Sequence, residues 1–249
     1  MYSVRQEQMK QYIEQENVVT IKSLQELFPD VSLMTIHRDL DALEARGIIV
    51  KFRGGARSVR YSSDPEFNVR MRENNMGKIQ IARKALELIQ PNTAIFLDAS
   101  TTNLALARIL PDIHLNIITT GPSIALELCR LHNPVVTLCC GTMNRKNLAL
   151  SGQNTLEMLD KINIDMAFIG VSGCSVDAGF TCGTEGDMLV KRKMIQKSRT
   201  SVVMCSKEKF SCLMPYTFAD LGEVDYLITE GILPEGFQSA ADAVNLKVL

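Results

Sequence analysis

Apolar residues recur at helical spacing in three short stretches near the start of the chain. In order, these apolar faces are Met9, Tyr12 and Ile13; Ile21, Leu24, Leu27 and Phe28; and Leu33, Ile36, Leu40 and Leu43. Thr20 and Ser32 stand before the second and third stretch, and their hydroxyls suit the N-termini of helices. Gly47 follows the third stretch, where it can end a helix. The pattern predicts three helices that share one small core.

The pattern changes from helical to alternating after Gly47. Ile48, Val50 and Phe52 alternate with other residues, the pair Gly54-Gly55 can turn the chain, and Val59 and Tyr61 alternate back. This predicts a two-stranded wing. Five basic residues and no acidic one occur over the same stretch, namely Arg46, Lys51, Arg53, Arg57 and Arg60.

Two interpretations fit this first part of the chain. A helical packing module with a surface hairpin explains the apolar positions, but it leaves the basic wing unexplained. A winged helix-turn-helix explains both, because its last helix enters the major groove of double-stranded DNA N-terminus first and its wing contacts the backbone. We therefore predict DNA binding, for which the candidate contact residues are Thr20, Ser32, Met34, Thr35, His37, Arg38, Lys51, Arg53 and Arg57.

The second part of the chain alternates short apolar runs with helical stretches. The predicted strands are 94–97, 115–119, 135–139, 166–171, 201–204 and 226–229, and the predicted helices between them are 102–110, 123–131, 155–162 and 188–198. Strands that are apolar on both faces and separated by helices predict an α/β domain with a mostly parallel sheet. The expected organisation is a DNA-binding domain at 1–61, a polar linker at 62–77 and an α/β domain at 78–249.

Composition and charge narrow the classes of protein. The chain has 249 residues with 46% hydrophobic residues, a formal net charge of −1, seven cysteines and three histidines. It shows no apolar stretch long enough to span a membrane and no signal region, so we expect a cytoplasmic protein with no membrane partner. The cysteines form no Cys-x-x-Cys pair and the histidines are far apart, so we expect neither a metal site nor a cofactor.

Hydroxyl-rich segments follow several of the predicted strands. The sequence Asp98-Ala99-Ser100-Thr101-Thr102 runs from the first strand into a helix, and Thr119, Gly141 and Ser206 also follow strands. Such residues are ordinary helix caps, but several of them at one edge of a sheet can also cradle a phosphate. We expect a small phosphorylated ligand there. Five glycines, Gly170, Gly173, Gly179, Gly183 and Gly186, predict a mobile loop nearby.

Both parts of the chain resemble the DeoR-type bacterial transcriptional regulators. The resemblance rests on 31–47 (VSLMTIHRDLDALEARG), 53–56 (RGGA), 66–70 (EFNVR), 95–102 (IFLDASTT), 165–170 (DMAFIG) and Ser206-Lys207. It implies a sensor domain similar to ribose-5-phosphate isomerase and CoA-transferase, which binds a phosphorylated sugar or a related metabolite and thereby alters operator binding. The effector-pocket residues that it implies are Asp98, Ser100, Thr101, Thr102, Thr119, Gly141 and Lys207.

The chain departs from the family pattern at positions close to the expected contacts. His37 stands where an arginine is common, and Phe52-Arg53 stands where Arg-His is usual. In the sensor part, the departures are Ala99 for glycine, Thr120 for asparagine, Cys140 for glycine and Met204 for aspartate. The first two departures bear on which bases are read. Those in the sensor part imply either an effector that differs from the usual sugar phosphates or one that binds weakly.

An enzymatic alternative follows from the likeness to an isomerase. Such an enzyme needs a carboxylate as base, for which Asp98, Asp177 and Glu185 are candidates, but no nucleophile with a base partner can be found from the spacing. We therefore predict no catalytic residues. We expect a homo-oligomer that places two recognition helices about 34 Å apart or a multiple of that distance. The resemblance implies a repressor, in which the effector shifts the population away from the DNA-binding state.

Overall fold

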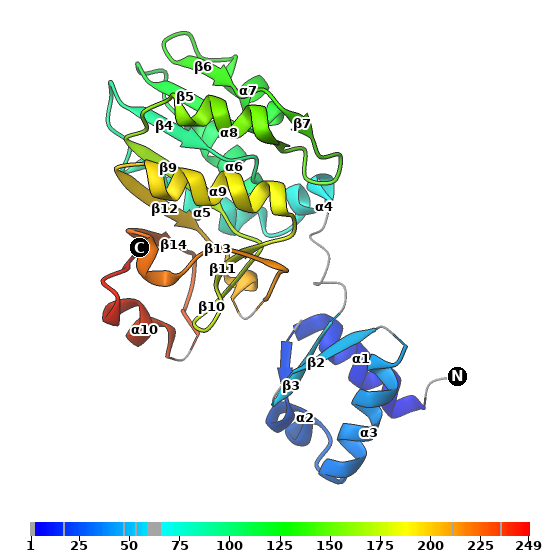
Figure 1. Cartoon of the computed structure of the whole chain (residues 1–249). Coiled ribbons are helices and arrows are strands. Elements are labelled where there is room, and N and C mark those ends of the chain that lie inside the picture. The colour runs from blue at the N-terminus through cyan, green and yellow to red at the C-terminus, as the bar shows by residue number, and fades with distance from the viewer. Residues whose placement is uncertain are drawn as a thin grey trace. The chain divides into compact units, whose positions relative to one another are not determined.

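The computed structural model describes residues 3–16, 18–46, 48–52, 54–58, 66–210, 212–234 and 236–249. The chain forms two compact units, Met1–Ser63 and Asp64–Leu249. Figure 1 shows the elements of each unit in chain order. Gly47, which the sequence places at the end of the third helix, and Arg53, Val59, Arg60 and Tyr61, which it assigns to the wing, lie outside the described residues.

The first unit contains the three predicted helices. They are α1 (Val4–Glu16), α2 (Ile21–Leu27) and α3 (Leu33–Glu44). Thr20 Oγ1 accepts the Ser23 N–H at 3.0 Å, and Ser32 Oγ accepts the Thr35 N–H at 3.3 Å. Both predicted N-caps are therefore confirmed, because each satisfies a backbone donor that the first turn of a helix leaves without a partner.

The core of the first unit uses most of the predicted apolar positions. Its buried residues are Met9, Ile13, Val19, Leu24, Ile36, Leu40, Leu43, Ile49 and Ala56. Leu27 and Leu33 are exceptions, with exposed fractions of 44% and 46%. Leu27 is the last residue of α2 and Leu33 the first of α3, so both lie at helix ends that flank the turn between these helices.

The wing differs from the prediction in its register. Its strands are β2 (Ile49–Phe52) and β3 (Gly55–Ser58), and β3 also pairs with a short strand that the sequence did not reveal, β1 (Val18–Thr20). Ile49 of β2 is buried, whereas Phe52 is 45% exposed. Gly54 makes the turn with φ +97°, and a Cβ at Gly55 would lie 2.1 Å from the Val19 carbonyl oxygen. Glycine at Gly55 therefore lets β3 approach β1.

A parallel sheet forms the centre of the second unit. Among the described residues it has seven strands in the order β15-β14-β12-β9-β4-β5-β6, and every neighbouring pair is parallel. The strands are β4 (Ala94–Leu97), β5 (Asn116–Thr119), β6 (Val135–Leu138), β9 (Met166–Gly170), β12 (Thr200–Met204), β14 (Tyr226–Ile228) and β15 (Lys247–Val248). The α/β prediction is confirmed, and β15, of two residues, is the strand that the pattern did not reveal.

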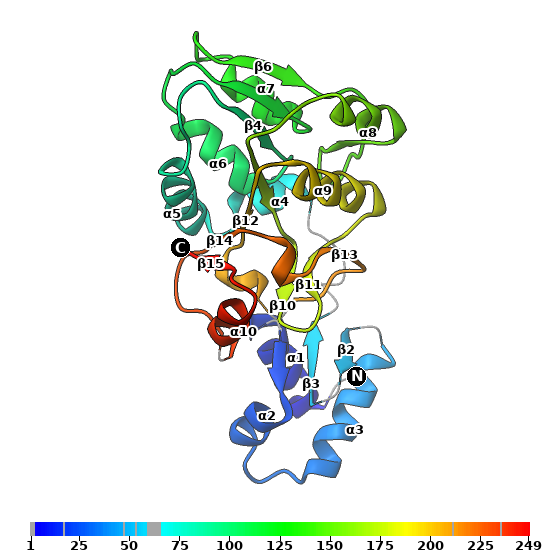
Figure 2. The same ribbon diagram turned by 60° about the vertical axis from the view of Figure 1, so that its left-hand side comes forward.

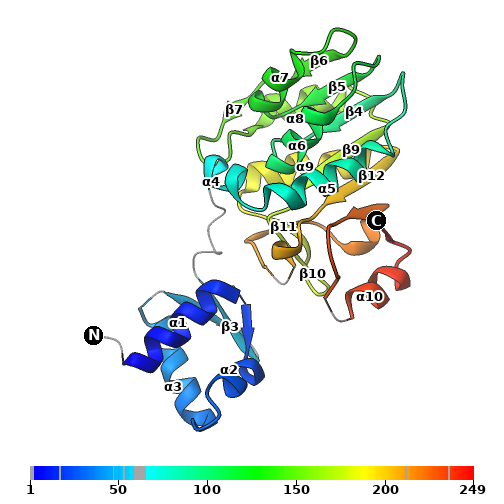
Figure 3. The same ribbon diagram turned by 180° about the vertical axis from the view of Figure 1, so that it is seen from behind.

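Helices cover both faces of this sheet. They are α4 (Phe67–Arg72), α5 (Asn75–Leu86), α6 (Thr101–Ile109), α7 (Pro122–Leu128), α8 (Gln153–Asp160), α9 (Glu185–Lys197) and α10 (Phe237–Ala243). Helices α8 and α9 lie on one face (Figure 1), and α5, α6 and α7 lie on the other (Figure 3). Two apolar clusters match these layers, because Leu159 and Val190 belong to one and Ile81, Leu104 and Ile124 to the other.

Two segments of the second unit differ from the predictions. The segment expected as a linker, 62–77, contains α4 and the start of α5 in its described part, and Phe67 is buried in the core with its N–H bonded to the Lys146 carbonyl at 2.7 Å. The expected glycine-rich loop instead includes β10 (Gly173–Ser175) and β11 (Gly179–Cys182), which form an antiparallel sheet with β13 (Tyr216–Ala219). These strands are too short for a periodicity to show.

Candidate functional site

The N-terminal half of α3 presents a row of exposed side chains. Met34 is 79% exposed, and His37 and Arg38 are also exposed. Within the described residues, Arg38 makes no ion pair. Thr35 is half-buried, and its hydroxyl lies 3.0 Å from that of Ser32. The structure therefore places the predicted α3 residues on one surface, where Arg38 is the available cation.

A buried carboxylate fixes α3 against α1. Asp39 is 2% exposed; its Oδ2 accepts from Arg5 Nε at 2.6 Å and its Oδ1 accepts from Gln6 Nε2 at 3.0 Å. Arg5 and Gln6 are both on α1, so this network sets the orientation of the exposed face of α3. The sequence shows Asp39 as part of a motif, but it does not reveal that Asp39 faces inward.

In the folded structure, acidic side chains of α3 neutralise part of the positive charge that the sequence places in the wing. Lys51 Nζ forms an ion pair with Asp41 of α3, and the Lys51 N–H donates to Glu44 Oε1 at 2.7 Å. Two acidic side chains of α3 therefore contact the stretch 46–60, in which the sequence has no acid. Arg57 is half-buried on β3 and has an interaction of its own. Lys51 thus connects the wing to α3.

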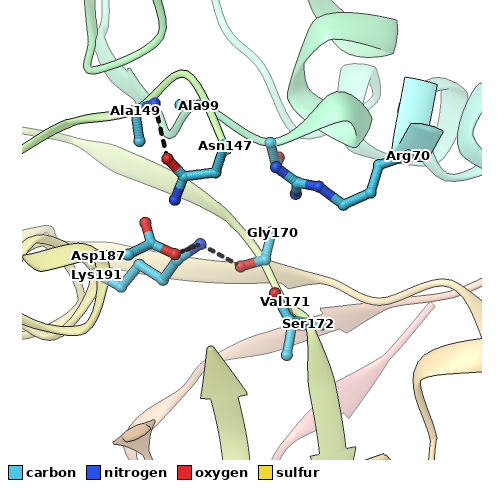
Figure 4. Close-up of a pocket in the computed structure, with 10 residues that line it drawn as sticks. Arg70, Ala99, Asn147, Ala149, Gly170, Val171, Ser172, Asp187 and Lys191 are labelled. Atoms are coloured by element: carbon cyan, nitrogen blue, oxygen red, sulfur yellow. Dashed lines mark hydrogen bonds and ion pairs between the residues drawn. The ribbon is translucent and has the colours of Figure 1, made fainter. Parts of the chain in front are cut away.

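Two adjoining hollows lie at the carboxyl edge of the parallel sheet, where α6 begins. They share Arg70, Ser100, Val171 and Ser172, and we call them together the α6 hollow. One side adds Ala99, Asn147, Ala149, Gly170, Asp187 and Lys191; the other adds Glu73, Lys78, Thr101, Thr102, Ser206, Glu208 and Lys209. In Figure 4, Arg70 of α4 and Lys191 of α9 enter this region from opposite sides.

Asp98 lies beneath the α6 hollow and organises it. Its Oδ1 accepts from the Ser100 N–H at 3.0 Å and from Asn103 Nδ2 at 2.8 Å, and its Oδ2 accepts from the Gly170 N–H at 2.9 Å and from Lys191 Nζ at 2.5 Å. Burial would raise the pKa of Asp98, but the charge of Lys191 and these hydrogen bonds outweigh it and hold the pKa below its usual value.

Lys191 carries the matching charge. Its Nζ also donates to the Gly170 carbonyl at 2.7 Å and lies 3.4 Å from Asp187 Oδ2. Burial would lower the pKa of Lys191, but the two carboxylates raise it above its usual value. Lys191 is therefore charged at neutral pH, and it joins β4, β9 and α9 at the floor of the hollow.

Two further buried lysines reach the same region. Lys78 of α5 is 5% exposed and Lys209 is 8% exposed. Lys78 Nζ donates to the carbonyl of Arg70 and, at 2.7 Å, to that of Glu73, so it holds the last turn of α4. Burial lowers the pKa of Lys78 to about 8. Its protonation can therefore respond to an anion placed in the hollow.

The structure brings together some of the predicted effector residues. Ser100, Thr101 and Thr102 line the α6 hollow, and Ser100 caps α6 by accepting the Asn103 N–H at 3.1 Å. Asp98 lies beneath the hollow and has no oxygen to offer a ligand, because four donors already use its carboxylate. The first turn of α6 thus supplies the backbone N–H groups that an anion needs.

The other predicted effector residues do not line the hollow. Thr119 is buried and accepts the Gly121 N–H at 3.0 Å. Gly141 has φ +141°, and a Cβ there would lie 2.1 Å from Thr155 Oγ1. Lys207 is exposed, whereas Lys209, two residues later in the 3₁₀ turn Lys207–Lys209, is buried at the hollow. The side chains of the two lysines therefore point in different directions from this turn.

Sequence reasoning missed several residues of the hollow. They are Arg70, Lys78, Asn147, Ser172, Asp187, Lys191 and Lys209. A signal existed for two of them, because Lys78 precedes Ile81 by three positions and Lys191 precedes Met194 by three positions, which places a lysine on an apolar helix face. Of the family departures, Ala99 lines the hollow and Met204 is buried in the core.

The carboxylates considered for catalysis are not placed to act as a base. Asp98 is saturated by donors, while Asp177 and Glu185 are exposed and do not line the α6 hollow. Within the described ranges, no group of three or more His, Cys, Asp or Glu side chains could hold a metal ion. No helix in the described part of the chain has the length and apolar character of a membrane span.

Comparison with known proteins gives the same two-part division. Residues 5–61 match the DeoR-like helix-turn-helix domain, and residues 73–231 match the DeoR C terminal sensor domain. The chain belongs to the DeoR family of transcriptional regulators. It is thus a DNA-binding regulator with a sensor domain and not an enzyme, which confirms the predicted class.

The chain is similar over nearly its full length to curated regulators. The HTH-type transcriptional regulator YgbI of Escherichia coli (strain K12) is 32% identical over 247 residues, which cover 98% of this chain and 96% of the relative. The HTH-type transcriptional repressor GlcR of Bacillus subtilis (strain 168) is 30% identical, covering 96% and 92%. A ribose 5-phosphate isomerase A from Methanocaldococcus jannaschii shares 17% identity over 55% of each chain with a TM-score of 0.40.

Proposed function

We propose that this protein represses an operon of sugar or carbon metabolism and that a phosphorylated sugar or related metabolite in the α6 hollow controls its binding to operator DNA. The observation that carries this proposal is the convergence of the first turn of α6 with Arg70, Lys78 and Lys209 in one hollow of the sensor unit. The name of GlcR as a transcriptional repressor supports the direction of regulation.

The hollow offers different chemistry at its two sides. Thr101 and Thr102 bring backbone N–H groups at the positive end of the α6 dipole, next to basic side chains, and this combination suits a phosphate. Asn147, Ser172 and Asp187 line the other side and offer polar groups to hydroxyls. An elongated ligand with a phosphate at one end and hydroxyls at the other matches the polar groups that line the two sides.

The first unit supplies the DNA contacts in this proposal. The exposed row on α3 enters the major groove, and the wing, held to α3 through Lys51, follows the phosphate backbone. A homo-oligomer presents two such units to half-sites about 34 Å apart or a multiple of that distance. Such a regulator acts where the DNA lies, which in a prokaryotic cell is the cytoplasm.

The effector acts through its differential affinity for two states of the protein. A metabolite that binds the α6 hollow more tightly in the state with low DNA affinity shifts the population toward release. Arg70 lies on α4, the first described helix of the second unit, and it lines the hollow. A ligand that contacts Arg70 therefore acts on the part of the sensor unit nearest in sequence to the DNA-binding unit.

Fluorescence anisotropy tests both parts of this proposal. The full chain is titrated onto labelled DNA from upstream of its own gene across a salt series, with and without a panel of sugar phosphates. We expect selective binding that weakens steeply with salt and is reduced by one phosphorylated compound but not by its unphosphorylated form. Absence of selective binding at low salt contradicts the operator assignment, and absence of any response to phosphorylated compounds contradicts the effector assignment.

A further inference from the structure

Among the strands of the described residues, β6 forms one end of the parallel sheet and pairs with β5 on one side only. Its sequence is Val135-Val136-Thr137-Leu138, which contains neither a charge nor a proline. Val135 and Leu138 have exposed fractions of 54% and 43%. Figure 2 shows this strand at the rim of the sheet. An uncharged edge strand thus exposes both of its end residues, while Val136 and Thr137 are half-buried.

The hydrogen-bonding groups on the open side of β6 can be identified. The Val135 N–H donates to the Leu115 carbonyl at 2.8 Å, and the Cys139 N–H donates to the Thr119 carbonyl at 2.9 Å. By the alternation of a parallel ladder, Thr137 also faces β5, so the N–H and C=O groups of Val136 and Leu138 point to the open side.

The two ends of the sheet are different. At the opposite end, β15 has two residues, and one of them is the exposed Lys247. A short strand and a lysine are the usual means by which proteins protect a sheet edge from pairing. Strand β6 is twice as long and carries no charged residue, and the nearest protection of its edge is Pro134, one residue before the strand begins. An edge that is uncharged and free of proline over these four residues is expected where another strand covers it.

We propose that β6 pairs antiparallel with β6 of a second copy of this chain, around a two-fold axis beside Thr137. A two-fold axis makes any strand complementary to itself, because each residue meets its counterpart in the reversed order. Val136 then faces Leu138 of the partner subunit, and each of these two equivalent pairs exchanges two hydrogen bonds, about four in total. The open groups of β6 are thereby used on both copies.

The side chains of β6 fit a copy of themselves. Val136 and Leu138 bring an apolar residue opposite an apolar residue, and Thr137 meets Thr137 of the partner subunit, a pair that is favourable across strands. The β6 strand of a second copy can therefore pair with this edge without contacts from any other part of the chain. The resulting dimer has one continuous sheet through both sensor units, and its formation does not depend on DNA or on effector.

Charge substitutions at the axis test this dimer. Thr137→Lys places two lysines directly opposite each other, and Thr137→Glu places two glutamates there. Sedimentation velocity of the full chain at micromolar concentration should give each variant half the mass of the wild type. An equimolar mixture of the two variants should recover the wild-type mass, because a lysine then faces a glutamate. Ile232→Lys, at a residue that is 95% exposed elsewhere, is the control and should keep the wild-type mass.

A covalent test needs no destabilising charge. In the Cys129→Ser, Cys140→Ser background, which removes the two exposed thiols, Thr137→Cys should give a disulfide-linked dimer on mild oxidation with oxidised glutathione. Each chain gives up one thiol proton and electron to the glutathione disulfide, which is reduced. The proposal would be overturned if the wild type were a monomer. It would also be overturned if the charge variants kept the wild-type mass and Thr137→Cys gave no more disulfide-linked dimer than its background.

Discussion

Asp98 and Lys191 form a buried ion pair with 2.5 Å between Oδ2 and Nζ, although 93 positions separate them in the chain. Their side chains are 1% and 5% exposed. The pair joins the carboxyl end of β4 to α9, and the Gly170 N–H and carbonyl of β9 are bonded to it as well. The geometry of the α6 hollow therefore depends on a carboxylate and an ammonium that bind each other inside the fold and are not free to bind a ligand.

Removal of one partner of this pair is expected to be costly. Lys191→Met leaves the Asp98 carboxylate buried without its counter-charge, so the free energy of unfolding should fall by about 3 to 5 kcal/mol. Urea denaturation of the full chain followed by circular dichroism measures this loss. Lys193→Met, which removes an exposed pair with Asp160, is the matched control and should change the value by less than about 1 kcal/mol. Equal losses for both variants would contradict the assignment.

Acid should destabilise the sensor unit through the same pair. The pKa of Asp98 is lower in the fold than the ordinary value of about 3.9, so the unfolded chain binds the proton more readily. The contribution of Asp98 is therefore fully present above about pH 4 and is lost as the pH falls through its folded pKa. Denaturation midpoints measured from pH 6 down to pH 2 should decrease in that window, and the decrease should be smaller for Asp98→Asn, which carries no titrating group at this position.

Binding of a phosphorylated effector should be coupled to protonation of Lys78. Its pKa of about 8 rises when an anion occupies the hollow, so the complex takes up protons at and above that pH, and affinity falls as the pH increases from 8 to 10. Calorimetry at pH 8.5 in two buffers of different ionisation enthalpy measures the uptake. The phosphate is already a dianion there, so the uptake reports on the protein. Lys78→Met should abolish it, whereas a wild type without proton uptake would refute the coupling.

Lys207 and Lys209 provide a matched pair for the effector response. Lys209 is buried at the α6 hollow and Lys207 is exposed outside it, so Lys209→Met should weaken effector binding by at least about tenfold, or 1.4 kcal/mol, and Lys207→Met should leave it unchanged. The readout is the effector concentration that releases half of the operator DNA. If Lys207→Met lost the response and Lys209→Met kept it, Lys207 would contact the effector, as the sequence predicts, and Lys209 would not.

Arg38 should make a direct contribution to DNA affinity. Arg38→Ala is expected to cost about 1 to 3 kcal/mol if the guanidinium reads a base, and to reduce the salt slope by about one if it contacts a phosphate. Anisotropy titrations at three salt concentrations distinguish these outcomes. Arg199→Ala, at an arginine of the sensor unit whose side chain is 85% exposed, should leave operator affinity as it is. An Arg38→Ala protein with wild-type affinity would exclude α3 as the recognition helix.

Local features of both units could be predicted from the sequence. The sequence predicts the N-caps at Thr20 and Ser32 because they depend on hydrogen bonds between near neighbours in the chain. It predicts six strands of the parallel sheet because they depend on the periodicity of apolar residues. The hydroxyl-rich start of α6 at the sheet edge follows for the same reason, because the carboxyl ends of parallel strands meet at one edge. The sequence did not reveal short strands such as β1 and β15, because two or three residues are too few to show a periodicity.

The identity of the charged partners was decided only by the tertiary structure. Lys51 appeared as part of a basic wing, yet its charge is paired with Asp41, and Asp98 appeared as a ligand contact, yet Lys191 and three other donors occupy it. Lys209 and not Lys207 lies at the hollow because a single 3₁₀ turn separates their directions. Sequence determines which residues can bear a charge or cap a helix, whereas contacts across many positions determine whether that charge faces a ligand or a neighbour inside the fold.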